Sequence, residues 1–319
     1  MRAIEPATLT ARVLGGESRA VARAVSLVEN AGGQLRELMA ALAPHTGGAR
    51  VIGLTGSPGV GKSTSTSALV SALRRRGERV GVLAVDPSSP FTGGALLGDR
   101  VRMQHHAADP GVFIRSMASR GHLGGLSWAT PHALRVLDAA GFETILVETV
   151  GVGQAEVDIA AHADTTVVLL APGMGDGVQA AKAGVVEIAD VFAVNKADRE
   201  GAHATARELR QVVSQVPRAP GQWRPPVVST VAAHEQGIDD LLAALDEHDT
   251  HLTISGERER RRLARAREEV EAIAMSALRE RLARPLRPGA ADLAELAQQV
   301  ATARIDPYTA ADRLLDTLG

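Results

Sequence analysis

The chain lacks cysteine and has few aromatic residues, and each scarcity excludes a class of function. Its 319 residues include 0 Cys, which rules out disulfide bonds, iron–sulfur clusters, thiolate zinc sites and a cysteine nucleophile. Aromatic residues make up 2% of the chain against 45% hydrophobic residues, so the core must consist mainly of aliphatic side chains. Nucleic-acid binding by base stacking is therefore not expected.

The chain also lacks a strong net charge and any long apolar run. It has 35 Lys and Arg against 37 Asp and Glu, a formal net charge of -2, so no general attraction to nucleic acid is expected. Its apolar runs are far shorter than the ~20 residues of a transmembrane helix. The N-terminal segment, with Glu5 and Glu17, has no apolar signal core. These features predict a cytoplasmic protein with no nucleic-acid partner and no membrane partner.

Residues 1–46 are predicted to be a helical extension. Apolar side chains recur at helical spacing from Leu9 to Ala43, and glycine pairs at 15–16 and 32–33 interrupt the pattern. We therefore expect a small helical leader, broken at these two pairs, ahead of the main domain.

Residues 47–246 alternate short β-branched runs with helical stretches. Near-continuous apolar strands separated by helices are typical of a parallel sheet that is covered on both faces. We therefore predict an α/β domain with a doubly wound parallel sheet. The predicted strands are Val51–Thr55, Val80–Val85, Val112–Arg115, Ile145–Val150, Thr165–Ala171, Val191–Val194 and Val227–Thr230.

Strand patterns stop near Leu245, and residues 247–319 are predicted to be a helical arm. Residues 256–284 form one charged helix, and further helical segments cover 290–303 and 309–318. The apolar seam of the charged helix is too short for a free coiled coil but suits packing against another pair of helices. The seam consists of Leu263, Ala266, Val270, Ile273 and Ala277.

A glycine-rich segment between the first predicted strand and a predicted helix matches the phosphate-binding pattern G-x-x-x-x-G-K-[ST]. Its glycines let backbone N–H groups surround a phosphate, and the following helix N-terminus adds positive potential. Lys62 is expected to face solvent and bridge the β- and γ-phosphates, and Ser63 to bind Mg2+. The segment is Gly56-Ser57-Pro58-Gly59-Val60-Gly61-Lys62-Ser63, followed by Thr64.

A second motif, Asn195-Lys196-Ala197-Asp198, follows the strand that ends at Val194. This is the edge of a parallel sheet at which ligands bind. A carboxylate at position 198 can accept hydrogen bonds from both N1–H and the exocyclic amine of guanine, whereas adenine has an acceptor at N1. The motif therefore favours a guanine nucleotide.

Acidic residues are predicted at the same edge. Glu148 and Gly151 stand where a nucleotide hydrolase commonly carries D-x-x-G, with Glu in place of Asp. Val152 occupies the position of the water-orienting Gln of Ras-like enzymes, so either intrinsic hydrolysis is slow or another acidic residue positions the water. Asp86 ends the second predicted strand and is a candidate for binding metal or positioning water, whereas Asp99 is as well explained as a turn former.

Several segments together closely resemble the MeaB/ArgK family of P-loop GTPases, to which the human methylmalonic aciduria type A protein belongs. They are GSPGVGKST, VDPSSP, GGALLGDRVRM, ILVETVGVGQ, APGMGDGVQAAKAG and NKAD, and the resemblance covers nearly the whole chain. It implies a P-loop GTPase domain between the helical leader and a C-terminal helical dimerisation arm. It also implies a chaperone that uses GTP, GDP and Mg2+. The partner would be an adenosylcobalamin-dependent acyl-CoA mutase, typically methylmalonyl-CoA mutase, whose cofactor loading it gates and which it protects.

The resemblance also implies roles for individual residues. Lys62 and Ser63 would be the phosphate and Mg2+ ligands, with an acidic set around the metal and the attacking water that consists of Asp86, Asp99 and Glu148. Guanine would be held by Asn195, Lys196 and Asp198, and by a last base-contacting loop, usually Ser-Ala, that appears here as Thr230, Val231 and Ala232. Residues 175–182, with Asp176 and Lys182, would form an additional switch loop that senses nucleotide and communicates with the mutase.

Two histidine-containing segments are expected to be ordinary surface. Asp246-Glu247-His248 lacks the glycine of the cobalamin motif D-x-H-x-x-G, so any cobalamin belongs to the partner. The three residues are expected on the surface of a helix end. The pair His105-His106 is likewise expected to be solvated, which argues against a metal-delivery role.

Two other functions remain open at this point. A small-molecule kinase, of the kind once linked to arginine and ornithine transport, would use the same phosphate-binding segment, and Asp86 could serve as its base. No residue pattern specifies an acceptor, however. A purely structural dimer that binds GTP without turnover is the third possibility.

Overall fold

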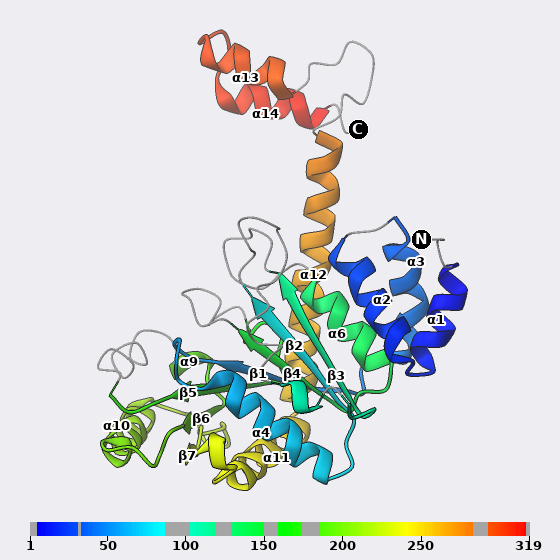
Figure 1. The fold of residues 1–319 in the computed structure, drawn as a ribbon. Helices are drawn as coiled ribbons and strands as arrows, with labels where there is room; N and C mark the ends of the chain where they lie inside the picture. The colour runs from blue at the N-terminus through cyan, green and yellow to red at the C-terminus, as the bar shows by residue number, and fades with distance from the viewer. Residues whose placement is uncertain are drawn as a thin grey trace. The chain divides into compact units, whose positions relative to one another are not determined.

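The sheet of this protein contains all seven strands that the sequence predicts. The computed structural model describes residues 5–30, 33–86, 103–106, 108–118, 129–149, 159–173, 186–282 and 293–316. Within these ranges the strands form one fully parallel sheet in the order β3-β2-β4-β1-β5-β6-β7 (Figure 1). The strands are β1 (Arg50–Thr55), β2 (Val80–Asp86), β3 (Val112–Ala118), β4 (Thr144–Thr149), β5 (Thr165–Leu170), β6 (Val191–Val194) and β7 (Val227–Ser229).

Helices α4 (Lys62–Arg75) and α11 (Ile238–Ile254) cover one face of the sheet. Because successive side chains of a strand point to opposite faces, β2 contributes Val80 and Val82 to this core and Leu83 and Val85 to the core on the other face. This two-sided burial explains why the strands are nearly continuous apolar runs. The prediction of a doubly wound α/β fold is confirmed.

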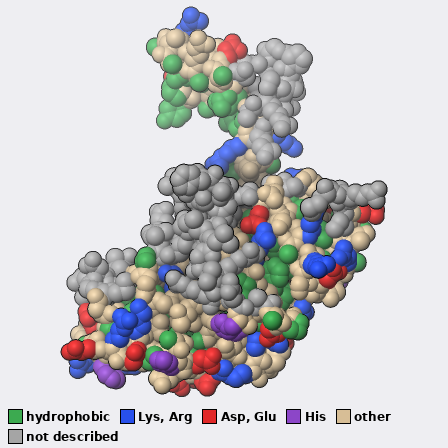
Figure 2. Space-filling model, viewed as in Figure 1, with side chains coloured by type: hydrophobic (Ala, Val, Ile, Leu, Met, Phe, Trp, Pro, Cys, Tyr) green, Lys and Arg blue, Asp and Glu red, His purple; other side chains and the backbone are tan. Residues whose placement is uncertain are grey.

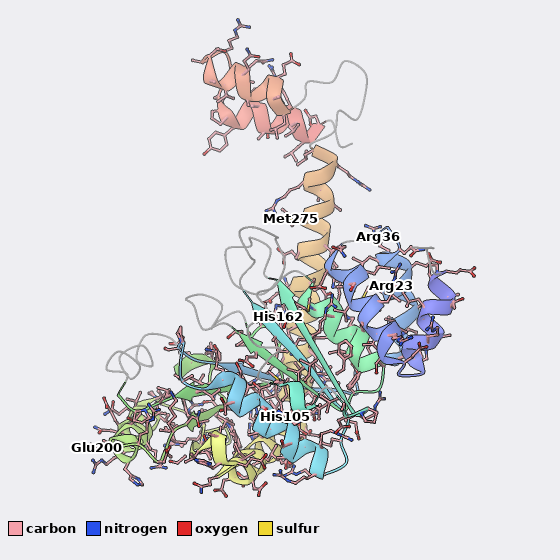
Figure 3. The ribbon with its side chains drawn as sticks, viewed as in Figure 1. Arg23, Arg36, His105, His162, Glu200 and Met275 are labelled. Atoms are coloured by element: carbon pink, nitrogen blue, oxygen red, sulfur yellow. The ribbon has the colours of Figure 1, made fainter. Side chains whose placement is uncertain are left out.

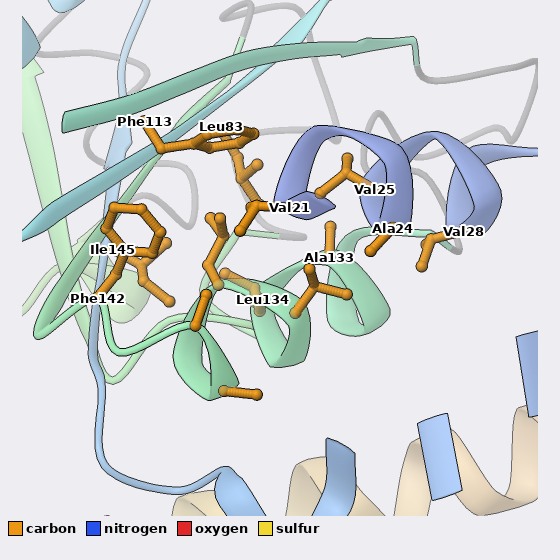
Figure 4. Close-up of a cluster of buried hydrophobic side chains, with 14 of the residues drawn as sticks. Val21, Ala24, Val25, Val28, Leu83, Phe113, Ala133, Leu134, Phe142 and Ile145 are labelled. Atoms are coloured by element: carbon orange, nitrogen blue, oxygen red, sulfur yellow. The ribbon is translucent and has the colours of Figure 1, made fainter. Parts of the chain in front are cut away.

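The opposite face is covered by the N-terminal helices and by α6 (Thr130–Ala139). The N-terminal helices are α1 (Pro6–Leu14), α2 (Ser18–Glu29) and α3 (Leu35–Leu42), which are interrupted near the two glycine pairs as expected. Figure 4 shows Val21 and Ala24 of α2 facing Ala133 and Leu134 of α6. The leader therefore shares one hydrophobic core with the sheet.

Arg115 attaches the leader to the sheet, and Asp138 holds the connection between the leader and the first strand. Arg115 on β3 donates hydrogen bonds to Ser26 Oγ at 2.9 Å and Glu29 Oε2 at 2.5 Å, both on α2. Asp138 of α6 accepts hydrogen bonds from the backbone N–H groups of residues 47–49, which connect α3 to β1. These contacts fix the path by which the chain enters the first strand.

Helix α10 (Ala202–Gln215) covers the last strands, with Leu209 and Val213 packed against Phe192 of β6. The short helix α9 (Val186–Ile188) precedes β6. No helix in the described part of the chain is long and apolar enough to span a membrane.

The structure corrects the expectation that residues 246–248 are all surface residues: Glu247 is exposed, Asp246 is half-buried and His248 is buried. His248 of α11 is fully buried; its Nδ1 lies 2.9 Å from Thr165 Oγ1 and its Nε2 lies 3.3 Å from Asp190 Oδ1. Asp246 accepts hydrogen bonds from Arg50 and Arg76. The reason is that α11 continues as one helix to Ile254, across the expected domain boundary after residue 246. The first compact unit of the chain accordingly extends to Arg258, and the second comprises Glu259–Gly319.

The C-terminal segment is helical, as predicted. Helix α12 (Glu257–Leu282) is followed by α13 (Leu293–Ala301) and α14 (Pro307–Asp316). Asp306 caps α14 by accepting hydrogen bonds from the backbone N–H groups of Tyr308 and Thr309. Figure 2 shows hydrophobic side chains exposed on the α13–α14 pair. The exposed large hydrophobic residues of these two helices are Leu293, Tyr308 and Leu315.

Candidate functional site

The phosphate-binding segment joins β1 to α4 at the carboxyl edge of the sheet, in the strand–loop–helix context that the motif requires. Gly56 has a φ of 138°, and a Cβ there would lie 2.2 Å from the carbonyl oxygen of Leu169. Gly61 has a φ of 97°, and a Cβ there would lie 2.3 Å from Asn195 Nδ2. Only glycine fits these two positions, because both the conformation and the close neighbour exclude a side chain.

The ammonium group of Lys62 lies on the inner side of this loop. Its Nζ donates hydrogen bonds to the carbonyl oxygens of Gly56 at 2.7 Å and Ser57 at 3.1 Å. The residue is 8% exposed, so the expectation that it faces solvent is wrong. The physical reason is that backbone carbonyls at the start of the loop replace water as partners of the charge.

Ser63 on the first turn of α4 meets Glu148 of β4. Ser63 Oγ donates a hydrogen bond to Glu148 Oε1 at 2.6 Å, although the two residues are 85 positions apart in the sequence. The register of β4 against β1 pairs Glu148 with Leu54, just before the phosphate-binding loop. A hydroxyl beside a carboxylate is a pair of oxygen donors that suits a hard cation such as Mg2+. The described residues contain no group of three or more His, Asp or Glu that could hold a metal ion.

A residue that the motifs did not identify also contacts Glu148. Thr66, one turn along α4 from Ser63, donates a hydrogen bond to Glu148 Oε2 at 2.9 Å. The sequence contained no signal for this pairing beyond a hydroxyl residue at helical spacing from Ser63. Glu148 is 3% exposed, so its carboxylate is shielded from bulk water and is satisfied by protein groups, Ser63 and Thr66 among them.

Asn195 connects the phosphate-binding loop to the loop after β7. Its Nδ2 donates to the Val60 carbonyl oxygen at 2.9 Å. Its Oδ1 accepts from the backbone N–H of Ala232 at 3.0 Å and from Thr230 Oγ1 at 3.3 Å. Asn195 is buried, and its side chain hydrogen-bonds groups of both loops, so it ties the two loops together.

The two charged residues of the same motif lie closer to solvent. Lys196 has a φ of 57°, and its Nζ donates to the Gly59 carbonyl oxygen at 2.6 Å. Asp198 is exposed. The backbone N–H of Ala197 donates to the Thr230 carbonyl oxygen at 3.0 Å, which holds the motif beside residues 230–232. The exposed carboxylate of Asp198 is thus available to an external ligand.

The remaining predicted positions differ in how much the structure describes. Ser57 and Thr64 are half-buried, Pro58 and Gly59 are exposed, and Val60 and Val231 are buried. Asp86 is the last residue of β2, paired with Ala118 of β3, and its side chain lies outside the described part of the structure. Four predicted site residues lie outside the described residues altogether: Asp99, Gly151, Asp176 and Lys182.

The expectation that both histidines of the pair are solvated holds only for His105. His105 is exposed, but His106 is buried, and the Nε2 atoms of both lie 3.1–3.2 Å from Ser67 Oγ on α4. Figure 3 labels His105 beside α4. Burial, and then the neighbouring His105, hold the pKa of the His106 imidazole below its ordinary value. The pair therefore attaches residues 103–106 to the helix that starts at the phosphate-binding loop.

Comparisons with known proteins show the family to which the chain belongs. Residues 21–285 match the family model described as methylmalonyl Co-A mutase-associated GTPase MeaB. A putative GTPase of Pyrococcus abyssi is 49% identical over 96% of this chain and 95% of its own. The GTPase ArgK of Escherichia coli is 38% identical over 77% of this chain and 76% of its own. A crystal structure titled LAO/AO transport system kinase superposes with a TM-score of 0.72, at 26% identity, and covers 99% of both chains.

Proposed function

Because the chain belongs to the MeaB family and is a P-loop GTPase, we propose that it hydrolyses GTP with Mg2+ in support of an adenosylcobalamin-dependent acyl-CoA mutase. The observation that carries the nucleotide part is the hydrogen bond between Ser63 and Glu148, which lies at the end of the same loop whose Gly56 carbonyl oxygen binds the Lys62 ammonium group. It brings a cation-binding pair of oxygens to the loop that receives phosphates. The mutase part is supported by the description of the family.

The residues of the site are proposed to have distinct roles in phosphoryl transfer. Lys62 supplies positive charge to the phosphates, and the N–H groups of the loop and of the first turn of α4 surround them. Mg2+, when bound, neutralises charge on the β- and γ-phosphate oxygens. Ser63 and Glu148 are the described residues that would hold it. Asp86, Asp99 and Gly151 are proposed to complete the acidic and γ-phosphate-sensing set around the attacking water.

The base is proposed to be guanine, read by Asp198. Its exposed carboxylate can accept hydrogen bonds from N1–H and the exocyclic amine, and the loop of residues 230–232 is held to the motif by the Asn195 side chain and by the backbone N–H of Ala197. Calorimetric titration with GDP and ADP tests this reading. GDP is expected to bind far more tightly, and equal affinities would contradict the assignment.

Hydrolysis by the isolated chain is proposed to be slow and to be accelerated by the mutase. The chain has Val152 where Ras-like enzymes carry a water-orienting Gln. Activating proteins raise the rates of such GTPases by ~10³ or more in the best cases. We propose residues 173–182, with Asp176 and Lys182, as the relay. Lys182→Ala should therefore leave basal hydrolysis nearly intact and weaken stimulation by purified methylmalonyl-CoA mutase. Stimulation equal to wild type would exclude this relay.

The protein is also proposed to be a homodimer that associates through α12. Leu263 is 73% exposed and Val270 is 68% exposed, and Ile273 follows on the same seam. A helix with an apolar stripe of this kind is favoured to bury it against a second copy.

A small-molecule kinase is the second candidate, because the solved structure with 26% identity is titled as a transport system kinase. Incubation with GTP and Mg2+ alone separates the candidates. Steady release of phosphate supports the GTPase. Phosphate transfer that requires an added acceptor, such as arginine or ornithine, would support the kinase. Nucleotide binding with neither reaction would leave a static binding module.

A further inference from the structure

Glu148 is held at both of its carboxylate oxygens by hydroxyl groups of one helix. Ser63 donates to Oε1 at 2.6 Å and Thr66 donates to Oε2 at 2.9 Å. Ser63 and Thr66 are three residues apart on α4 and therefore lie on the same helical face. Thr66 is fully buried, and no motif in the sequence includes it.

The hydroxyl groups of Ser63 and Thr66 have different roles. A serine hydroxyl has one proton and two lone pairs, so Ser63 can donate to Glu148 and still offer its oxygen to a cation. Thr66 is bonded to the far oxygen of the carboxylate. The terminal torsion of a glutamate side chain is intrinsically broad, so a carboxylate held at a single oxygen can rotate about that torsion. A second hydrogen bond restricts this rotation.

We propose that Thr66 is a positioning residue of the Mg2+ site, which keeps the Glu148 carboxylate oriented with Oε1 beside Ser63. The proposal rests on the function proposed above. Thr66 Oγ1 also lies 3.0 Å from the carbonyl oxygen of Lys62. The carboxylate is the stronger acceptor for its single proton, because hydrogen bonds to charged groups are about twice as strong as neutral ones.

The same geometry explains why glutamate stands at position 148. The side chain of glutamate is one methylene longer than that of aspartate, and it reaches two hydroxyl groups that are one helical turn apart. Glu148 and Thr66 therefore belong to one arrangement, in which the carboxylate takes its orientation from α4 itself. The helix that begins at the phosphate-binding loop then sets both cation-binding oxygens.

The test compares three variants of the full chain. Thr66→Val replaces the hydroxyl with a methyl group and keeps the shape of the side chain, whereas Thr66→Ser keeps the hydroxyl. Ser65→Ala is the matched control, because Ser65 is buried on the same turn of α4 and its Oγ has no hydrogen-bond partner among the described residues. The measurement is the release rate of a fluorescent GDP analogue as Mg2+ is varied from micromolar to millimolar. Thermal midpoints without nucleotide are recorded in parallel.

Thr66→Val should raise the Mg2+ concentration for half-maximal nucleotide retention about tenfold, the effect of losing one hydrogen bond to a charged group. Thr66→Ser should return it to within about twofold of wild type, and Ser65→Ala should leave it unchanged. A wild-type Mg2+ dependence in Thr66→Val would overturn the proposal. So would equal shifts in Thr66→Val and Ser65→Ala, which would indicate a structural role only.

Thr66→Ala provides a second way to remove the hydroxyl and is read in the same manner if the valine variant does not fold. Failure of the proposed function would look different. In that case the wild-type protein itself would release the GDP analogue at a rate independent of Mg2+. The Mg2+ dependence of the wild-type protein thus tests the nucleotide site, and the difference between wild type and the Thr66 variants tests the role of Thr66.

Discussion

Asn195 and Asp198 belong to one four-residue motif, yet replacing them should affect different properties of the protein. Asn195 is buried and bonded to three groups, the Val60 carbonyl, the Ala232 N–H and the Thr230 hydroxyl. Asp198 is exposed. Asn195→Ala should therefore lower both the stability of the protein and its affinity for any nucleotide. Asp198→Asn should alter only the choice of base.

The magnitudes follow from burial. Val60, Thr230 and Ala232 are all buried, so Asn195→Ala leaves polar groups without partners at about 1–3 kcal/mol each. Partial entry of water reduces the total to ~2–4 kcal/mol, which corresponds to a thermal midpoint roughly 5–10 °C lower for a unit of this size. An exposed substitution such as Asp198→Asn should change stability by no more than about 0.5 kcal/mol.

Two measurements separate the variants. Circular dichroism gives the thermal midpoints, and calorimetric titration gives the affinities for GDP and ADP. Asn195→Ala should weaken both nucleotides, because the phosphate-binding loop loses its tie. Asp198→Asn should reduce the preference for GDP by ~2 kcal/mol or more. The reasoning fails if Asn195→Ala keeps the wild-type midpoint, or if Asp198→Asn lowers it as much as Asn195→Ala does.

Three further predictions concern Lys62, the exposed seam of α12 and His106. Lys62→Ala should abolish GTP hydrolysis while far-ultraviolet circular dichroism stays that of wild type; unchanged turnover would contradict the site. Val270→Lys on the exposed seam of α12 should give a monomer by sedimentation, whereas Glu268→Lys on the opposite side of that helix should not. The pKa of His106 is lowered by burial and by His105, against the opposing charges of Asp109 and Glu235. Its contribution to stability is therefore complete above about pH 6.5 and is lost as pH falls below that value. His106→Gln should flatten the decline of the thermal midpoint between pH 7.5 and 5.5, and an unaltered decline would show that another group is responsible.

The sequence alone predicted features whose signals are local. A buried parallel strand needs an unbroken apolar run, so each of the seven strands was visible in a few consecutive residues. The breaks between the N-terminal helices coincide with glycine pairs. The phosphate-binding loop was also predictable, because positive φ at Gly56 and Gly61 demands glycine whatever the rest of the chain does.

Only the tertiary structure decided which distant groups meet. Glu148 finds Ser63 and Thr66 on α4 because the register of β4 with β1 carries it to the end of the first strand. His248 appeared to lie at a surface, yet it is buried against Thr165 and Asp190 because α11 packs on the sheet beyond the expected boundary. Burial and hydrogen bonding of such side chains depend on residues scores of positions away, and no short window of sequence contains that information.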